Sequence, residues 1–324
     1  MKNLVLTLGM AYSILGPVTQ NAVAQTWPTR VIRLIVPLAP GGSTDIMARV
    51  VAQKLEQEWG QSVLIENRAG ASTIIGTDLV AKAAPDGYTI LVAASPYANN
   101  VALYPGKLPY DINTDFAPIA LISTSPLLLV IHGNLPVKSV SEFVAFAKSN
   151  PGKMNFASAS VGGVTHLAGE YFKMAADIKA VHIAYKGNAP ALTDLVAGRV
   201  DFIFNGPVSL IPFIKSGKIR PLAASSRKRV TSFPDVPTME EVGYKGFEAN
   251  GWLGFVGQAK LPHTIINKFN TSTNRALQHP DVVQRIESDG SVAGQGTPED
   301  FGAFLLSENI RWTKVIKAAN VTPD

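Results

Sequence analysis

Residues 33–55 read RLIVPLAPGGSTDIMARVVAQKL, and this stretch decides the fold. Its first part, residues 34–36, is an apolar run that predicts a β-strand, which ends at two prolines and the pair Gly41 and Gly42. From Asp45 onward the apolar residues have the four-residue spacing of a helix. A glycine-rich turn between a strand and a helix leaves free backbone N–H groups at the positive end of the helix, where a carboxylate can bind. The stretch therefore predicts an α/β fold and one wall of a binding cleft.

The same order of strands and helices occurs in two units. In the first unit we expect strands at residues 31–36, 62–66 and 88–93, and helices at residues 45–59 and 74–84. In the second we expect strands at residues 153–157, 180–184 and 200–204, and helices at residues 165–175 and 190–197. Leu167, Tyr171 and Met174 should face inward from the 165–175 helix. Because alternating strands and helices form parallel sheets with right-handed crossovers, two similar lobes are expected.

Two further β-rich runs, residues 127–131 and 252–256, lie where the chain would cross between the lobes. We therefore expect lobe one to comprise residues 25–126 and 250–324, and lobe two residues 127–249. The last helix should begin at Thr297, a good N-cap followed by proline and two acids. Its apolar face should return to lobe one.

The N-terminus has the pattern of an export signal. Lys2 is followed by a mostly apolar segment and by the small residues Ala22 and Ala24, which predicts a signal peptide over residues 1–24 and a periplasmic location. An N-terminal membrane anchor is disfavoured because the apolar run is too short to span a bilayer. The remaining 300 residues favour two domains.

Composition excludes several classes of function. The sequence has no cysteine, so disulfides and thiolate metal sites are excluded. Its net charge is +5 and falls to +4 when Lys2 is removed with the signal. Because no basic block stands out, nucleic-acid binding is not expected.

Ligands of open parallel sheets bind beyond the carboxyl ends of the strands. Five segments rich in Gly, Ser, Thr and Asn lie at such ends, and they contain no arginine: residues 40–45, 70–76, 95–100, 158–166 and 185–194. We expect ligand contacts through N–H groups, hydroxyls and water rather than salt bridges. The predicted ligand-binding residues are Gly41, Gly42, Ser43, Thr44, Asp45, Ser72, Thr73, Ser95, Tyr97, Asn99, Ser158, Ser160, Thr165, His166, Asn188 and Asp194.

Several of these residues have a second interpretation. The glycines serve tight turns, and Asp45 is equally a first-turn acid that stabilises its helix. Tyr97 either stacks on a ligand or packs against its lobe, and Asn99 either closes the site or caps a turn. His166 is favoured as a neutral hydrogen-bonding residue at a helix start, and Arg68 as a residue that ties down a loop.

No catalytic, cofactor or metal motif is present. The sequence lacks the G-x-S-x-G, G-x-x-x-x-G-K-[ST], G-x-G-x-x-G and H-E-x-x-H patterns. Ser160 and His166 could form a nucleophile–base pair, but no orienting acid is evident nearby. We therefore expect a binding protein without a cofactor, and keep a secreted enzyme acting on a small acid as the minor alternative.

An ordered set of segments from residue 27 to the C-terminus carries a family resemblance. The segments are RLIVPLAPGGSTDIMAR, SVLIENRAGA, AKAAPDGYTILV, LPYDINTDFAPIA, HLAGEYF, AYKGNAPALTDLVAGRVDF, FPDVPTMEEVGYKGFE and TPEDF. The chain resembles the extracytoplasmic solute receptors of tripartite tricarboxylate transporters, the Bug family. The resemblance implies a type II periplasmic-binding-protein fold, two doubly wound α/β lobes joined by a hinge.

The same resemblance implies delivery of a small organic acid to a membrane permease of one large and one small subunit. We expect the protein itself to be a monomer. One ligand carboxylate would be held through two ordered waters and backbone groups of residues 40–45 and 70–76. Lobe two would set specificity through residues 158–166 and 186–194. A ligand-binding partner of a membrane sensor kinase is an alternative, because it would have the same fold.

One departure from the family pattern affects the ligand. The family commonly reads ENRPGAGG where this chain reads ENRAGAST, so Ala69 replaces proline and Ser72 and Thr73 replace glycines. We expect a narrower pocket in lobe one with extra hydrogen-bond donors. With few charges near the cleft, a mono- or dicarboxylate is favoured over a tricarboxylate, and Tyr97 admits an aromatic acid.

Overall fold

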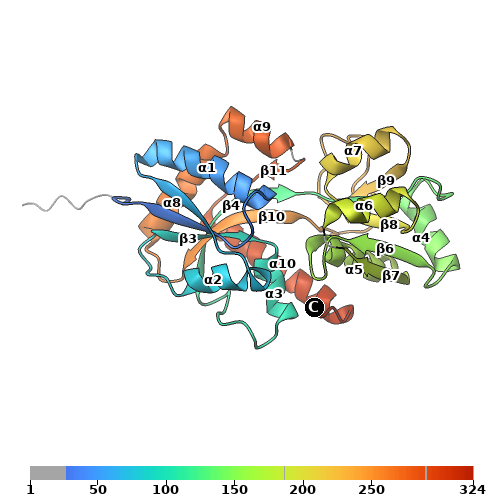
Figure 1. The fold of residues 1–324 in the computed structure, drawn as a ribbon, viewed down its shortest axis with the longest axis horizontal. Coiled ribbons are helices and arrows are strands. Elements are labelled where there is room, and N and C mark those ends of the chain that lie inside the picture. The colour runs from blue at the N-terminus through green and yellow to red at the C-terminus, as the bar shows by residue number, and fades with distance from the viewer. Residues whose placement is uncertain (1–26, 186, 289, 324) are drawn as a thin grey trace, which may run out of the picture.

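The structure, a computed structural model, describes residues 27–185, 187–288 and 290–323, so the predicted signal peptide lies outside the described residues. Two α/β lobes lie side by side, each built on one sheet (Figure 1). We call the part built on the six-stranded sheet lobe one and the part built on the five-stranded sheet lobe two. The strand orders are β11-β4-β10-β3-β1-β2 and β7-β6-β8-β5-β9.

Lobe one begins as the sequence predicts. Strands β1 (Ile32–Val36), β2 (Val63–Asn67) and β3 (Thr89–Ala94) are parallel, and helices α1 (Ser43–Trp59) and α2 (Ile74–Ala81) connect them. Met47, Val51 and Leu55 of α1 are buried against this sheet. Helix α1 ends at Gly60, which adopts the left-handed conformation that glycine allows.

The rest of this sheet differs from the expected parallel arrangement. Strand β10 (Gly251–Gln258) lies antiparallel between β3 and β4 (Phe116–Ser125), and the short β11 (Val292–Ala293) extends the antiparallel edge. Three helices of this lobe have the bounds α3 (Pro96–Leu103), α8 (His263–Ala276) and α9 (Pro280–Ser288).

Lobe two is also mixed. Strand β6 (Met154–Ser158) pairs in parallel with β7 (Ala180–Ala184) and β8 (Phe202–Asn205), whereas β5 (Leu128–His132) is antiparallel to β8 and β9 (Ile219–Ala224). Its helices are α4 (Val140–Ser149), α5 (Val164–Ala176), α6 (Asn188–Val196) and α7 (Pro207–Lys215). Met174, predicted to face inward, has 37% of its surface exposed, because α5 buries the side of the helix that carries Leu167 and Phe172.

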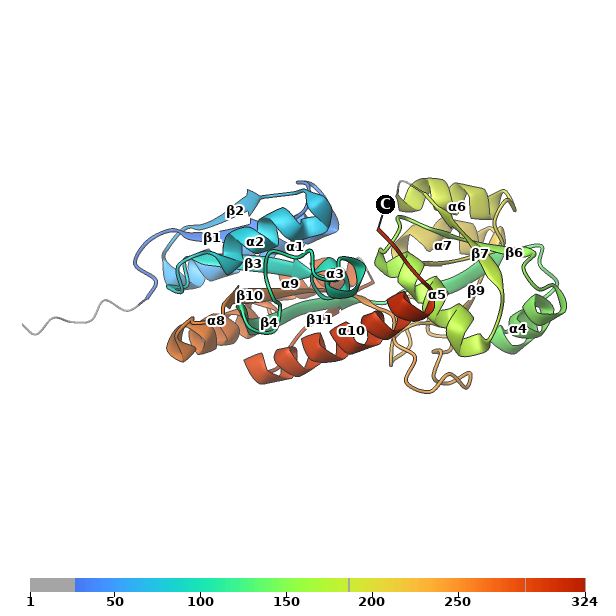
Figure 2. The ribbon, with the colours of Figure 1, turned by 90° about the horizontal axis from the view of Figure 1, so that it is seen from below.

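The last helix, α10 (Pro298–Ala318), runs from lobe one to lobe two (Figure 2). The predicted cap is present: the Thr297 hydroxyl accepts from Asp300 N, and the Asp300 carboxylate accepts from Thr297 N. Phe301 and Leu305 pack in the core of lobe one, but Trp312 packs in the core of lobe two. The expected return to lobe one is therefore correct only for the first half of the helix.

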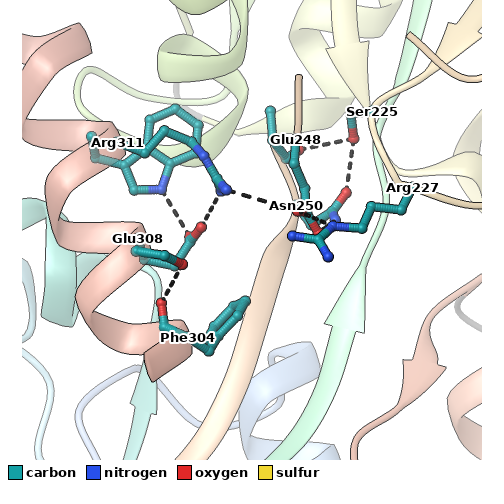
Figure 3. Close-up of polar contacts among 10 residues, drawn as sticks. Ser225, Arg227, Glu248, Asn250, Phe304, Glu308 and Arg311 are labelled. Atoms are coloured by element: carbon teal, nitrogen blue, oxygen red, sulfur yellow. Dashed lines mark hydrogen bonds and ion pairs between the residues drawn. The ribbon is translucent and has the colours of Figure 1, made fainter. Parts of the chain in front are cut away.

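Charged groups tie this helix to the second crossing between the lobes (Figure 3). The buried Glu308 carboxylate accepts from Trp312 Nε1 at 2.9 Å and contacts Arg311. Arg311 also lies 3.7 Å from Glu248, which Arg227 contacts at 2.9 Å. Burial raises the pKa of Glu308, and the Arg311 guanidinium opposes that shift. The chain of contacts joins α10 to residues that flank the lobe-two side of β10.

We expect Trp312→Ala to lower the free energy of unfolding by about 4 kcal/mol, because it leaves a cavity where α10 enters lobe two. Leu306→Ala on the same helix, where 56% of the side chain is exposed, should change it by less than about 0.5 kcal/mol. Urea unfolding followed by far-ultraviolet circular dichroism measures both. Equal effects of the two substitutions would show that the second half of α10 is not packed into lobe two.

Candidate ligand-binding cleft

A cavity of about 410 Å³ lies between the lobes, within the range of small-molecule sites. Lobe one lines it with the start of α1, the end of β3 and the facing ends of β4 and β10. Lobe two lines it with the starts of α5, α6 and α7. The lining residues are Leu38, Ser43, Thr44, Met47, Ala94, Ser95, Pro96, Ser123, Ser125, Leu127, Val164, Thr165, Asn188, Asn205, Gly206, Gly251, Trp252, Leu253 and Ser291.

None of the lining residues among those the structure describes carries a charge. The cavity instead has hydroxyls, two side-chain amides and the N-terminal ends of three helices of 17, 13 and 9 residues, namely α1, α5 and α6. In Figure 1 the N-terminal end of α1 lies on the side of lobe one that faces lobe two. Such an arrangement suits an anion held by N–H groups and helix dipoles.

A second cavity, also of about 410 Å³, lies next to this one and is lined by Thr124, Asn250 and the basic loop that starts at Arg227. The two cavities share Ser291, whose hydroxyl hydrogen-bonds to that of Ser125 at 2.7 Å. Arg227 and Arg229 in the second cavity are already paired with Glu248 and Glu241. We therefore assign the ligand to the first cavity, which has the converging helix ends.

Asp45 holds the turn that forms the lobe-one wall. Its carboxylate is 3% exposed and accepts hydrogen bonds from Gly41 N and Asn67 Nδ2, both at 2.9 Å. Arg49 donates to both carboxylate oxygens at 3.0 Å. The Arg49 guanidinium, with the Gly41 and Asn67 donors, lowers the pKa of Asp45 to about 2 against the opposing effect of burial. Asp45 thus organises the loop that presents Ser43 and Thr44.

Gly41 supplies the conformation that this turn requires. Its φ is +83°, in the left-handed region that favours glycine. Asn67, the last residue of β2, also donates to the Leu38 carbonyl at 3.1 Å and so joins the end of β2 to the loop after β1. Arg49 and Asn67 were not predicted as site residues, although Asn67 lies at a strand end where the sequence rule would have found it.

A network of short-range contacts holds the lobe-two wall. Thr165 Oγ1 accepts from Ala159 N at 3.0 Å, and Gly187 N donates to Ala159 O at 2.8 Å. Because Asn188 follows Gly187 directly, the starts of α5 and α6 are fixed to the same loop. His166 Nδ1 accepts from Gly162 N at 3.0 Å, as expected for a neutral histidine at a helix start.

Asn205, at the end of β8, is one of four polar lining residues that the sequence analysis missed, together with Ser123, Ser125 and Ser291. It is 2% exposed, and its Oδ1 accepts from Gly206 N at 2.8 Å. Its Nδ2 has no hydrogen-bond partner among the described residues. A buried donor without a partner is costly, so this amide is suited to a ligand oxygen. Asn205 follows the predicted strand 200–204, so the rule of strand carboxyl ends would have found it.

The structure separates the predicted site residues into three groups. Those that line the cavity are Ser43, Thr44, Ser95, Thr165 and Asn188. Those that support its walls without lining it, from the turns or from the adjoining ends of α1, β6 and α5, are Gly41, Gly42, Asp45, Ser158, Ser160 and His166. The third group neither lines the cavity nor supports its walls, and consists of Ser72, Thr73, Tyr97, Asn99 and Asp194.

Tyr97 packs inside lobe one rather than toward a ligand. Its ring lies 5.4 Å from that of Phe116 and 6.5 Å from that of Trp252, and its hydroxyl donates to Ile112 O at 3.2 Å. Burial raises the pKa of this phenol above its ordinary value. Of the two interpretations of Tyr97, the structure supports packing.

Asp194, another predicted site residue, does not line the cavity. Its carboxylate accepts hydrogen bonds from Tyr185 at 2.6 Å and from Arg199 at 2.8 Å.

The unusual loop before α2 has a strained backbone. Ala71, Ser72 and Thr73 all have positive φ, at 44°, 51° and 76°, which is uncommon for residues other than glycine. Asn100 Nδ2 donates to Ser72 O at 2.7 Å and supports the loop. Thr73 is buried and its Oγ1 has no partner among the described residues, and neither hydroxyl lines the cavity. The structure therefore does not place the expected extra donors of Ser72 and Thr73 in the cleft.

The described residues include no group of three or more His, Cys, Asp or Glu side chains arranged to hold a metal ion. Within the same part of the chain, no helix is both long and apolar enough to cross a bilayer.

Residues 47–321 match the family described as the tripartite tricarboxylate transporter family receptor. The chain belongs to this family. It is 37% identical to the protein BugT of Bordetella pertussis over 319 residues, which cover 98% of this chain and 97% of BugT.

Solved receptor structures have the same two-lobed fold. One is Rpa4515 of R. palustris with adipate, at 34% identity and a TM-score of 0.75, covering 92% of this chain and all of that one. Another is MatC of Rhodopseudomonas palustris with bound malate, at 32% identity and a TM-score of 0.72, covering 90% of this chain and all of that one. The expected Bug-family membership and two-lobed α/β fold are confirmed. Because the family consists of receptors, the alternative of a secreted enzyme is not supported.

The role assigned to Asp45 makes stability depend on pH. Its pKa is lowered from 3.8 to about 2 in the folded state, so its contribution is fully present above about pH 4 and is lost as the pH falls toward 2. We expect Asp45→Asn to be less stable than the wild type at pH 6, with a difference that shrinks as the pH falls to 2. Urea unfolding across this range measures it.

The exposed pair of Arg30 and Asp86 supplies the control for this experiment. Asp86→Asn should change the free energy of unfolding by less than about 0.5 kcal/mol. A constant difference between Asp45→Asn and the wild type from pH 6 to pH 2 would contradict the proposed role of the charge.

Proposed function

We propose that this protein is a periplasmic receptor that captures a small organic carboxylate between its lobes and delivers it to a membrane permease of the tripartite tricarboxylate type. The observation that carries the proposal is the uncharged cavity at which the starts of α1, α5 and α6 converge. Family membership supports the transport role, and the predicted signal peptide supports the location.

The ligand we propose has two acidic groups a few carbons apart. One carboxylate would bind at the start of α1, beside Ser43 and Thr44. The other would face lobe two, where Thr165, Asn188 and the free Nδ2 of Asn205 supply donors. A helix N-terminus stabilises a negative charge by about 0.3–1 kcal/mol when exposed and by up to about 2 kcal/mol when partly buried.

The apolar lining suits the carbon chain of such a ligand. Leu38, Met47, Leu127 and Trp252 line the cavity between the polar ends. Adipate and malate, named with the two solved relatives, are both dicarboxylates and differ in length. The cavity volume of about 410 Å³ accommodates either, so both belong in a first panel of ligands.

The proposed mechanism is capture by two walls. A ligand that contacts both lobes stabilises the arrangement in which the lobes are close. It shifts the population toward this closed arrangement to the extent that it binds the closed form more tightly than the open form. Because the lining has no charge, the binding energy comes from many modest contacts rather than from one ion pair. The permease would then recognise the closed receptor.

A panel of mono-, di-, tri- and aromatic carboxylates tests this function. We expect at least one dicarboxylate to raise the melting temperature by about 5 °C when present at a hundredfold excess over its Kd, because it binds only the folded protein. Isothermal titration calorimetry then gives the affinity. A panel that produces neither a thermal shift nor heat would contradict the function. If the carboxylate-bound protein captured a sensor-kinase ectodomain but not the permease, the result would contradict the delivery step.

The lobe-two anchor can be tested separately. We expect Asn205→Ala to raise the Kd of the bound dicarboxylate about ten- to a hundredfold, since a hydrogen bond to a charged group contributes about 1.5–3 kcal/mol. Asn113→Ala, in an exposed loop of lobe one, is the matched control and should leave the Kd unchanged. An unchanged Kd for Asn205→Ala would show that this amide does not contact the ligand.

A further inference from the structure

At two places the backbone of a glycine in one lobe meets a side chain of the other lobe. A Cβ added to Gly290, in the turn between α9 and β11, would lie 2.3 Å from Cγ of Pro207, at the start of α7. A Cβ added to Gly162, before α5, would lie 2.8 Å from Cδ1 of Leu103, at the end of α3. Figure 1 shows α9 with β11 opposite α7 on one edge of the boundary between the lobes, and α3 opposite α5 on the other. The lobes can therefore come this close only because both positions lack a side chain.

The contact between Gly290 and Pro207 borders the cleft. Ser291 and Gly206, the neighbours of these two residues in sequence, both line the cavity. Gly206 N also donates to Oδ1 of Asn205, the lobe-two anchor, at 2.8 Å. The distance between Gly290 and Pro207 therefore sets how near the Asn205 amide comes to lobe one.

The proline ring makes this contact rigid. Pro207 lies in the first turn of α7, where the fixed φ of proline suits a helix, and its ring cannot rotate away from a neighbour. An added Cβ at Gly290 would collide with the ring only at Cγ, since it would lie 3.4 Å from Cδ and 3.5 Å from Cβ, which are ordinary contact distances. The collision therefore depends on a part of Pro207 that alanine lacks.

The contact between Gly162 and Leu103 is more adaptable. Leu103 belongs to α3 of lobe one but is buried in the apolar cluster of lobe two that contains Phe156 and Phe172. The atom that a Cβ at Gly162 would meet is the far end of this leucine side chain, which can rotate. Gly290 therefore gives the clearer test.

The turn alone is a second reason for a glycine at position 290. Gly290 has a φ of +71°, in the left-handed region that favours glycine. Gly217, which lies between α7 and β9, has the same φ of +71°, but an added Cβ there would have no atom within 4 Å. A substitution at Gly217 therefore reproduces the backbone strain without the contact between the lobes.

We propose that Gly290 and Gly162 are positioning residues that allow the lobes to close on the ligand, with Pro207 and Leu103 as the surfaces on which they stop. The proposal rests on the carboxylate-binding function proposed above. A ligand that bridges the lobes binds tightly only in the closed arrangement, so a side chain that holds the lobes apart weakens binding without touching the ligand.

The first experiment compares Gly290→Ala with Gly217→Ala in the full mature chain. Calorimetry measures the Kd of malate and adipate. We expect Gly290→Ala to raise the Kd of the bound acid about tenfold or more, because an overpacked contact is costly, and Gly217→Ala to leave it unchanged. Without ligand the two variants should lose melting temperature equally, since the backbone strain is the same. Equal Kd values in the two variants would overturn the proposal.

A second substitution should rescue the first. Pro207→Ala removes Cγ and Cδ but keeps the Cβ that lies at an ordinary distance. Combined with Gly290→Ala, it should return the Kd to within about threefold of that of Pro207→Ala alone. Val208→Ala, at the next and partly exposed position of α7, is the matched control and should not rescue Gly290→Ala. A Pro207→Ala that fails to rescue, or a Val208→Ala that rescues equally, overturns the proposal.

A cross-link detects the contact without relying on ligand affinity. The chain has no cysteine, and an ideal Cβ at position 290 lies 3.5 Å from that of Pro207, a separation found in disulfides. Gly290→Cys combined with Pro207→Cys is treated with oxidised glutathione, and the cross-linked peptides are measured by mass spectrometry. We expect a disulfide to form without ligand, and about fivefold faster when malate or adipate is bound.

The outcomes of the cross-link separate this proposal from the proposed function. If no disulfide forms, or if a carboxylate binds without speeding its formation, the closure contact is refuted. If the disulfide forms while no carboxylate of the panel binds, the receptor function is refuted and the contact between the lobes stands.

Discussion

The buried carboxylate of Asp45 is the constraint on which the binding wall depends. It joins the turn after β1 to the last side chain of β2 and to the next turn of α1, through Gly41, Asn67 and Arg49. An unpaired carboxylate at this depth would be costly, so the three partners stabilise one geometry of the turn. That geometry exposes the first N–H groups of α1 to the cavity while the protein's own negative charge stays covered.

The same design explains how an uncharged cavity can bind an anion. A lysine or arginine in the lining would attract any acid, whereas helix ends, hydroxyls and amides act only over hydrogen-bond distances. Selectivity then depends on whether donors from the two lobes meet the ligand at the same time. Asn205 is important in this respect, because its Nδ2 is a buried donor of lobe two that has no partner among the described residues.

Local patterns predicted the fold better than they predicted the site. The strand, turn and helix at residues 33–55 could be predicted because the apolar run, the glycine pair and the helical spacing all act within the segment itself. Tyr97 shows the limit: a tyrosine at a strand end fits a binding role, but packing against Phe116 and Trp252, both distant in sequence, decides its orientation. No helix was predicted at residues 96–103, where α3 lies. Its Asn99 and Asn100 disfavour a helix, and their burial overrides that preference. The contact of Gly290 with Pro207 could not be predicted, since the two residues belong to different lobes and meet only where one lobe packs on the other.

The last helix limits how the lobes can move. Because α10 buries Phe301 in lobe one and Trp312 in lobe two, a change in the angle between the lobes must repack one end of it or bend it. The region between these ends carries the buried Glu308, whose partners Arg311 and Trp312 lie within one turn. Arg311 also faces Glu248, so this carboxylate pair shares one guanidinium at the boundary between the lobes. The Arg311 ion pairs keep part of their attraction when the charged groups move slightly apart, whereas a gap of about 0.5–1 Å already removes a quarter to a half of a dispersion contact.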